Sequence, residues 1–194
     1  FATQGFAGTG IDAVCRQAGV AKTALYWHFG SKEGLIAAVV EEAGNQFIEQ
    51  LQKRVYLEGD PIQRIDRLIE GWRVILSESP ELVRLPMMVQ LEHGAKQDEP
   101  IGAAVRRVLE RAEAALVEGI EDSLGAVVAQ PERVAQTIVA LLQGAAVRQG
   151  MQPDAGLDGF FEEVRRTIVL MIWSRLPESV RSELEQGARG DRPA

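Results

Sequence analysis

The sequence predicts an all-α protein with two domains. We expect an N-terminal three-helix helix-turn-helix domain at residues 1–45, with its first helix truncated, and a C-terminal helical bundle at residues 46–194. Apolar residues recur at spacings of three and four along most of the chain, which is the period of an amphipathic helix. No stretch shows the alternation of a half-buried strand, and Pro and Gly residues mark where one helix ends and the next begins.

Two short helices near the start of the chain are joined by a turn that contains Gly19. They are predicted at residues 11–18 and 22–29, and this arrangement is a helix-turn-helix. In the second helix Leu25 and Phe29 are four residues apart and fill the inward face. The remaining arc presents amine, hydroxyl, imidazole and indole groups, from Lys22, Thr23, Tyr26, Trp27 and His28. Such groups contact phosphates, base edges or thymine methyls, although the two large aromatic residues could instead cover a small core.

A longer set of residues surrounds these helices in a recognisable order and spacing: Gly5, Phe6, Gly8, Thr9, Ile11, Val14, Ala18, Gly19, Val20, Leu25, Tyr26, His28, Phe29, Ser31, Lys32 and Leu35. Because of these residues, the segment at 5–40 resembles the DNA-binding domain of the tetracycline-repressor (TetR) family of bacterial transcription regulators. The resemblance implies a regulator that dimerises through its last two large helices. Gly10 and Ala21 depart from the family's usual Ser or Thr, so a side-chain N-cap is not expected at either position.

We therefore expect the helix at residues 22–29 to bind double-stranded DNA. A homodimer would present two copies of this helix to successive major grooves of a palindromic operator, about 34–36 Å apart. Lys22 and Lys32 are expected to contact phosphates. The complete set of expected DNA-binding residues is Lys22, Thr23, Ala24, Tyr26, Trp27, His28 and Lys32.

Charge is distributed unevenly along the chain. The net charge is −7 and the isoelectric point is about 5.0, which argues against nucleic-acid binding over the whole surface. Residues 1–40 hold three basic and two acidic residues, a net charge of +1, whereas the remainder holds 18 basic and 26 acidic residues, a net charge of −8. Phosphate affinity must then come from a small patch and from helix N-termini.

Five longer helices and one interrupted helix should follow the helix-turn-helix. The first extends from residue 32 to residue 56, with Ser31 as its N-cap. Both domains share this helix, so its displacement could transmit a signal from one domain to the other. The helix that begins after Ser79 contains Pro86, and we expect a kink or break near residues 84–85. The other helices are expected at residues 61–76, 101–125, 131–150 and 157–176, with a polar loop at residues 94–100 and a short helix and frayed tail at residues 178–194.

The helices at residues 131–150 and 157–176 are apolar over more than half of their circumference. Such a helix must bury two faces, and an identical chain offers a matching partner for the second face, unless both helices are internal to one bundle. We expect a homodimer through these two helices. We also expect a small, mostly apolar effector to bind between the C-terminal helices. The candidate pocket residues, each of which core packing could equally explain, are Trp72, Ile75, Met87, Met88, Leu91, His93, Val108, Phe160 and Met171.

Other functional classes receive little support from the sequence. Cys15 is the sole cysteine and falls on an inward helix face, so a buried thiol is expected rather than a disulfide. No apolar leader opens the chain, and the longest apolar run, at residues 168–173, is too short to span a bilayer, so we expect a cytoplasmic protein without membrane contact. His28 and His93 have no metal-site spacing with a carboxylate, and no nucleotide or nucleophile motif occurs. No catalytic residue, metal or cofactor is expected.

Two functional hypotheses remain at this point. The first is a ligand-responsive regulator, a repressor by preference, although the sequence does not separate repression from activation. The second is an all-helical small-molecule-binding or enzyme module whose helix-turn-helix is vestigial. Gly10, Ala21 and the weak net charge of +1 favour the second hypothesis.

Overall fold

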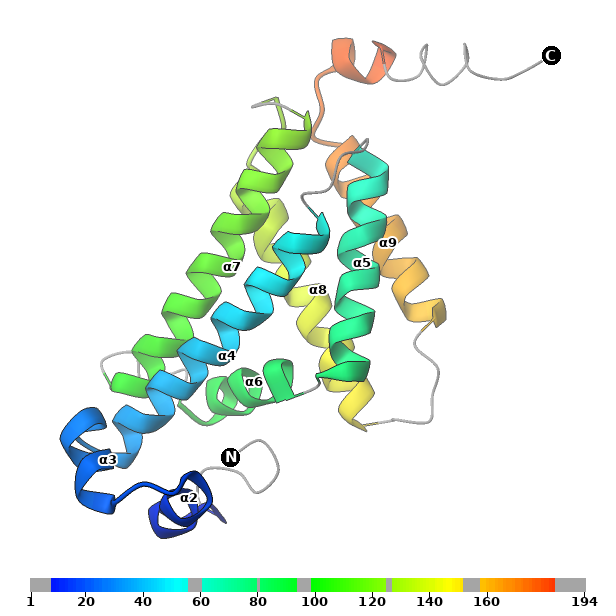
Figure 1. Cartoon of the computed structure of the whole chain (residues 1–194). Helices are drawn as coiled ribbons and strands as arrows, with labels where there is room; N and C mark the ends of the chain where they lie inside the picture. Colours follow the sequence, from blue (N-terminus) through cyan, green and yellow to red (C-terminus); the bar gives the residue numbers. More distant parts are fainter. Residues whose placement is uncertain are drawn as a thin grey trace. The chain divides into compact units, whose positions relative to one another are not determined.

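The computed structural model describes residues 8–55, 61–79, 81–93, 99–124, 127–151 and 158–183. Within these ranges the regular elements are helices and no strand occurs, so the all-α prediction is confirmed (Figure 1). The helices are α2 (Ile11–Ala18), α3 (Lys22–Phe29), α4 (Lys32–Val55), α5 (Pro61–Glu78), α6 (Glu81–His93), α7 (Pro100–Leu124), α8 (Pro131–Met151) and α9 (Asp158–Trp173). Residues 178–183 are also helical.

The helix boundaries follow the Pro and Gly residues of the sequence. Pro61, Pro100 and Pro131 each open a helix, where a missing N–H costs nothing. Of the kink or break predicted near residues 84–85, the break is wrong, because α6 continues through Pro86 as one helix, and the kink stays a prediction. Leu85 and Val89, on either side of that proline, are both buried in one hydrophobic cluster, and such packing stabilises the helix despite the lost hydrogen bond. The start of the chain to residue 7, the loop at 94–98 and the tail beyond 183 lie outside the described residues.

The chain divides into two compact units. The first contains Phe1–Lys53 and Gly71–Ala112, and the second contains Arg54–Glu70 and Glu113–Ala194. The first unit therefore contains α2, α3, most of α4, the end of α5 from Gly71, α6 and the first half of α7. The domain boundary expected after residue 45 is not visible in this division, and it remains a prediction.

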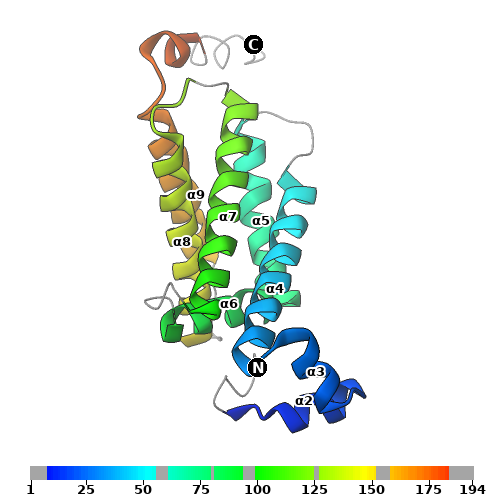
Figure 2. The ribbon, with the colours of Figure 1, turned by 90° about the vertical axis from the view of Figure 1, so that its left-hand side faces the viewer.

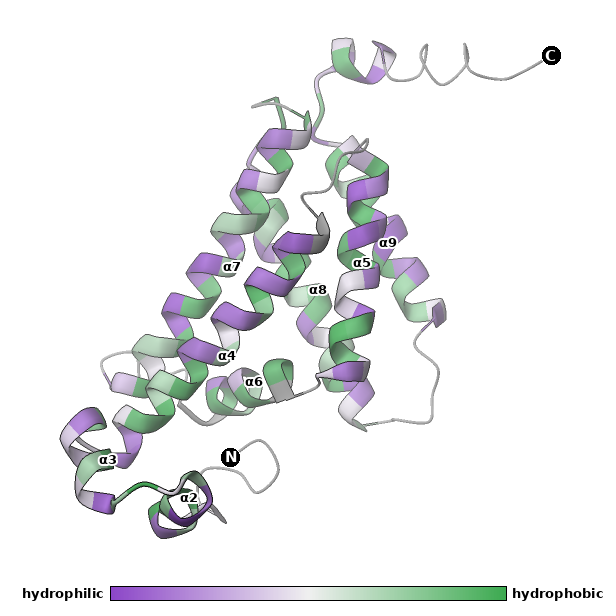
Figure 3. Ribbon diagram, viewed as in Figure 1, coloured by the Kyte–Doolittle hydropathy of each residue, from purple (hydrophilic) through white to green (hydrophobic). Residues whose placement is uncertain are grey.

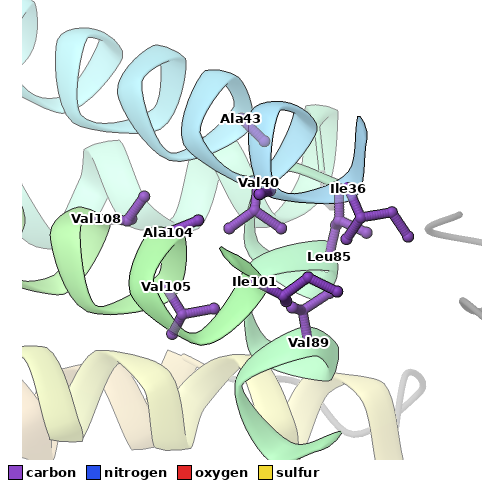
Figure 4. Packing of buried hydrophobic residues seen from close by; sticks show 10 residues of the cluster. Ile36, Val40, Ala43, Leu85, Val89, Ile101, Ala104, Val105 and Val108 are labelled. Atoms are coloured by element: carbon purple, nitrogen blue, oxygen red, sulfur yellow. The ribbon is translucent and has the colours of Figure 1, made fainter. Parts of the chain in front are cut away.

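The core of the first unit lies between α4, α6 and α7, which are side by side in both views (Figures 1 and 2). Bands of hydrophobic residues alternate with hydrophilic ones along α4 and α7, as the spacing of three and four requires (Figure 3). Val40 of α4 is directed toward α7 (Figure 4), and both Val40 and Ala104 are completely buried. The cluster consists of Ile36, Ala37, Val40, Ala43, Leu85, Val89, Ile101, Ala104, Val105 and Val108.

Gly44 allows α4 and α7 to approach each other closely. A Cβ atom at this position would lie only 2.5 and 2.6 Å from the two methyl groups of Val108. Nearby, Arg107 Nε donates to Glu41 Oε1 at 2.6 Å across the same pair of helices. A glycine in a helix interior usually lowers stability, but here its lack of a side chain is what the packing requires.

We expect Gly44→Ala to lower the free energy of unfolding by about 1–2 kcal/mol, because the cost of overpacking exceeds the gain in helix propensity. Urea denaturation followed by circular dichroism measures the change. Gly144→Ala in α8 is the matched control, since a Cβ there meets nothing within 4 Å. The control should instead raise stability by about 0.5–1 kcal/mol. Equal effects of the two substitutions would contradict this account of the close contact.

The second unit is built around α8 and α9, which pack side by side (Figures 1 and 2). Arg165 of α9 donates to Asp66 of α5, and this hydrogen bond together with the carboxylate charge raises the pKa of the guanidinium. Arg148 lies over the Phe160 ring, 5.8 Å from its centroid, so a cation–π contact also joins α8 to α9. None of the described helices is both long and apolar enough to cross a membrane.

Candidate nucleic-acid interface

The helix-turn-helix is held together by a small hydrophobic core of its own. Ile11 and Cys15 of α2 pack with Leu25 of α3 and Leu35 of α4, and each of these side chains is less than 10% exposed. The buried thiol expected at Cys15 is confirmed. Because Leu25 is fixed in this core, the orientation of α3 about its own axis is also fixed.

Glycines and one serine shape the two turns of the motif. Gly19 ends α2 with a φ of 69°, in the left-handed region that other residues avoid, and Val20 N donates to Cys15 O at 3.1 Å. Ser31 caps α4 as predicted, since its Oγ accepts a hydrogen bond from Gly34 N at 3.0 Å. A Cβ at Gly34 would collide with the carbonyl oxygen of Phe29, so α3 and α4 meet tightly at this point.

The outer face of α3 presents aromatic and polar side chains to solvent. Trp27 is 88% exposed and Tyr26 is 40% exposed, so the interpretation in which both cover a small core is wrong. His28 is exposed as well and packs edge-on against the ring of Phe29, with centroids 4.6 Å apart. Thr23 and Ala24 are also exposed, and Lys32 is half-buried at the start of α4. The expected DNA-binding residues on α3 are thus brought together on one accessible surface, which we call the α3 face: Lys22, Thr23, Ala24, Tyr26, Trp27 and His28.

One member of the α3 face already has a charged partner. Lys22 Nζ lies 2.9 Å from Asp12 Oδ1 and 3.2 Å from Asp12 Oδ2, so the first residue of α3 is linked to the first turn of α2. The hydrogen bond and the negative charge of Asp12 raise the pKa of the Lys22 amine. The role of Asp12 was missed from the sequence, because a separation of ten residues across a turn does not reveal a contact.

The candidate pocket residues do not gather in one unit. In the first unit Trp72, Ile75 and Val108 are buried, and Met87 and Met88 are half-buried. Leu91 of the same unit is 83% exposed. Phe160 and Met171 are half-buried in the second unit, and the His93 side chain lies outside the described part of the chain.

Trp72 has a feature that the sequence did not show. Its Nε1 donor is buried and has no acceptor among the described residues, and its ring packs edge-on against Phe47 of α4 at a centroid distance of 4.8 Å. A buried donor without an acceptor is costly, so it favours a bound group that supplies one. Elsewhere in the described chain, no group of three or more His, Cys, Asp or Glu side chains is arranged to hold a metal ion.

The helix-turn-helix matches a known family model. Residues 1–39 match the model described as bacterial regulatory proteins of the tetR family. This match covers 39 of the 194 residues. The TetR resemblance inferred from the motif is thereby confirmed for the helix-turn-helix segment.

Individual proteins resemble this chain over longer stretches. The HTH-type transcriptional regulator LmrA of Bacillus subtilis is 26% identical over 105 residues, which are 54% of this chain and 56% of LmrA. A transcriptional regulator from Rhodococcus sp. RHA1 has a similar structure, with a TM-score of 0.72, 19% identity and 89% of each chain covered. FadR from Bacillus subtilis, solved in complex with stearoyl-CoA, has a TM-score of 0.67 and 18% identity, with 88% of this chain and 92% of FadR covered. At these identities the two structures establish a shared fold.

Proposed function

We propose that this TetR-family protein is a ligand-responsive transcriptional regulator that acts in the cytoplasm. In this proposal it is a repressor that binds a palindromic operator as a homodimer and leaves it when a small, mostly apolar effector binds. The observation that supports DNA binding best is the 88% exposure of Trp27 on a short helix whose neighbouring side chains are also exposed. An exposed tryptophan between Tyr26 and His28 has no role in the protein's own core, whereas it can pack on sugars or thymine methyls in a major groove.

The DNA contact that we propose divides into two kinds. Tyr26, Trp27 and His28, with Thr23 and Ala24, would contact bases, sugars and thymine methyls, and these contacts set the sequence preference. Lys22 and Lys32 would contact phosphates and set the register of α3 in the groove. The remaining surface is acidic, and its repulsion would restrict DNA to the α3 face.

The proposed effector site lies in the first unit. In this proposal the apolar walls would come from Trp72 and Ile75 of α5, Val108 of α7 and the half-buried Met87 and Met88 of α6. The structurally similar FadR was solved with stearoyl-CoA, and a ligand with a long apolar part is compatible with such walls. For DNA to be released, the effector must bind the conformation that does not bind DNA more tightly than the one that does. Since α4 contributes both Leu35 to the helix-turn-helix core and Phe47 to the Trp72 contact, we propose that α4 transmits this preference.

Exposed apolar side chains on α8 and α9 support the proposed homodimer. Leu170 is 61% exposed, Met151 is 77% exposed and Val147 is 45% exposed, although each lies on a helix whose opposite face is buried. An identical chain could bury these side chains against its own α8 and α9 about a two-fold axis. In this arrangement the exposed apolar residues of both helices would form one interaction surface.

We expect Leu170→Glu to convert the dimer into a monomer at about micromolar concentration, because a carboxylate in an apolar interface costs several kcal/mol of desolvation. Sedimentation velocity measures the change. Ile62→Glu is the matched control, since Ile62 is an exposed apolar residue on another helix of the same unit, and it should leave the dimer intact. A wild-type protein that sediments as a monomer would contradict the proposed interface.

Operator binding can be tested without knowing the regulated genes. Wild-type protein is used to select duplexes from a random library, and the enriched duplex is then titrated at several salt concentrations. We expect an inverted repeat whose half-site centres lie about 34–36 Å apart, and an affinity that falls steeply with salt. Failure to enrich any duplex would contradict the proposed function, and turnover of a small molecule without DNA affinity would favour the enzyme module instead.

A further inference from the structure

The ion pair between Asp12 and Lys22 lies at the edge of the surface that we propose binds DNA. Both oxygens of the Asp12 carboxylate are within 3.2 Å of Lys22 Nζ. The Lys22 side chain is 50% exposed and that of Asp12 is 75% exposed, so both groups remain accessible to an approaching phosphate. Lys22 is the first residue of α3, at the end of the helix where backbone N–H groups have no intrahelical acceptor.

This pair matters because the N-terminal segment has few cations. Residues 1–40 contain Arg16, Lys22 and Lys32 as their basic residues, against Asp12 and Glu33. A carboxylate on Lys22 offsets one of three positive charges in the segment. A phosphate that approaches Lys22 must therefore share the ammonium donors with the Asp12 carboxylate.

We propose that Asp12 competes with DNA phosphates for Lys22 and thereby limits the affinity of the protein for DNA without changing its sequence preference. This inference rests on the proposed function and adds a residue to it. Phosphate contacts contribute equally on all sequences, so Asp12 would lower the affinity for operator and for unrelated duplex by the same factor. A limited affinity for DNA would help a regulator that has to leave its operator. The effector then releases the protein with a smaller difference between its own affinities for the conformation that binds DNA and the one that does not.

A double-mutant cycle tests the competition. Wild-type protein, Asp12→Asn, Lys22→Gln and the double variant are titrated with the enriched operator and with a scrambled duplex of the same length, between about 50 and 200 mM salt. We expect Asp12→Asn to bind both duplexes roughly two- to fivefold more tightly, which is the range for an exposed ion pair. The slope of log affinity against log salt should steepen by up to about one, because Lys22 then neutralises a further phosphate. In the Lys22→Gln background, Asp12→Asn should have no effect.

Each other outcome has a definite meaning. A gain in affinity that persists in the Lys22→Gln background would show a general charge effect and would overturn the proposal. Weaker binding by Asp12→Asn, with unchanged thermal stability, would show that Asp12 positions Lys22 for the phosphate and would overturn it as well. If Asp12→Asn unfolds, Asp12→Glu, which retains the charge, should restore both stability and wild-type affinity. Wild-type protein that binds no duplex would instead refute the proposed function itself.

Discussion

Replacing Trp27 with alanine should lower operator affinity by roughly 5- to 150-fold, which corresponds to about 1–3 kcal/mol for an aromatic contact with nucleic acid. Because the side chain is 88% exposed, its removal takes little from the protein's own packing, and the free energy of unfolding should change by no more than about 0.5 kcal/mol. Fluorescence anisotropy of a labelled operator measures the affinity, and urea denaturation measures the stability. Tyr26→Ala, at 40% exposure, should act in the same direction.

The matched control for Trp27→Ala is Leu91→Ala. Leu91 is a large apolar side chain of the same compact unit and is 83% exposed, but it lies on α6 rather than on the α3 face. Its substitution should leave operator affinity unchanged. If Trp27→Ala and Leu91→Ala bound the operator as tightly as wild-type protein, α3 would not be the helix that contacts DNA.

Ile36→Ala should give the largest loss of stability, about 2–5 kcal/mol, because it opens a cavity where α4, α6 and α7 meet. Ile36 is 1% exposed and belongs to the same cluster as Leu85 and Ile101. Ile36 directly follows Leu35, which packs in the helix-turn-helix core. Weaker packing of α4 at Ile36 should therefore also weaken operator binding at temperatures near the unfolding midpoint. Differential scanning calorimetry and operator titration at two temperatures measure both effects.

The control for this prediction is Ile62→Ala, an identical truncation at a side chain that is 46% exposed. It should cost less stability than Ile36→Ala, since nearly half of the Ile62 surface already contacts water. Similar losses for the two variants would show that the α4, α6 and α7 cluster is not the core of the first unit.

The helices could be predicted from local sequence because apolar residues recur at spacings of three and four in each of them, and capping or helix-breaking residues mark their ends. α2 and α3 occupy the predicted residues, and Ser31 caps α4 as expected. Pro86 misled the prediction, because the local rule against proline in a helix ignores the tertiary burial of Leu85 and Val89. Gly34 lowers the helix propensity of α4, but a side chain there would strike the carbonyl oxygen of Phe29.

The exposure of the α3 face was largely predictable, whereas contacts between helices were not. A helix of eight residues with Leu25 buried must expose the opposite arc, so the position of Trp27 follows from periodicity. The partner of Lys22 and the buried Nε1 of Trp72 depend on contacts between helices, which periodicity does not describe. For the same reason, pocket residues chosen by their apolar character included Leu91, which is exposed.

The central claim is that the α3 face meets DNA, and the solvent accessibility of Trp27 tests it directly. A variant with Trp72→Phe and Trp173→Phe retains Trp27 as its sole tryptophan. Acrylamide should quench the fluorescence of this variant strongly in the free protein, because Trp27 is 88% exposed. At saturating operator, we expect the quenching constant to fall severalfold. Quenching that is equally strong in a complex proven by anisotropy would show that DNA binds elsewhere and would contradict this account.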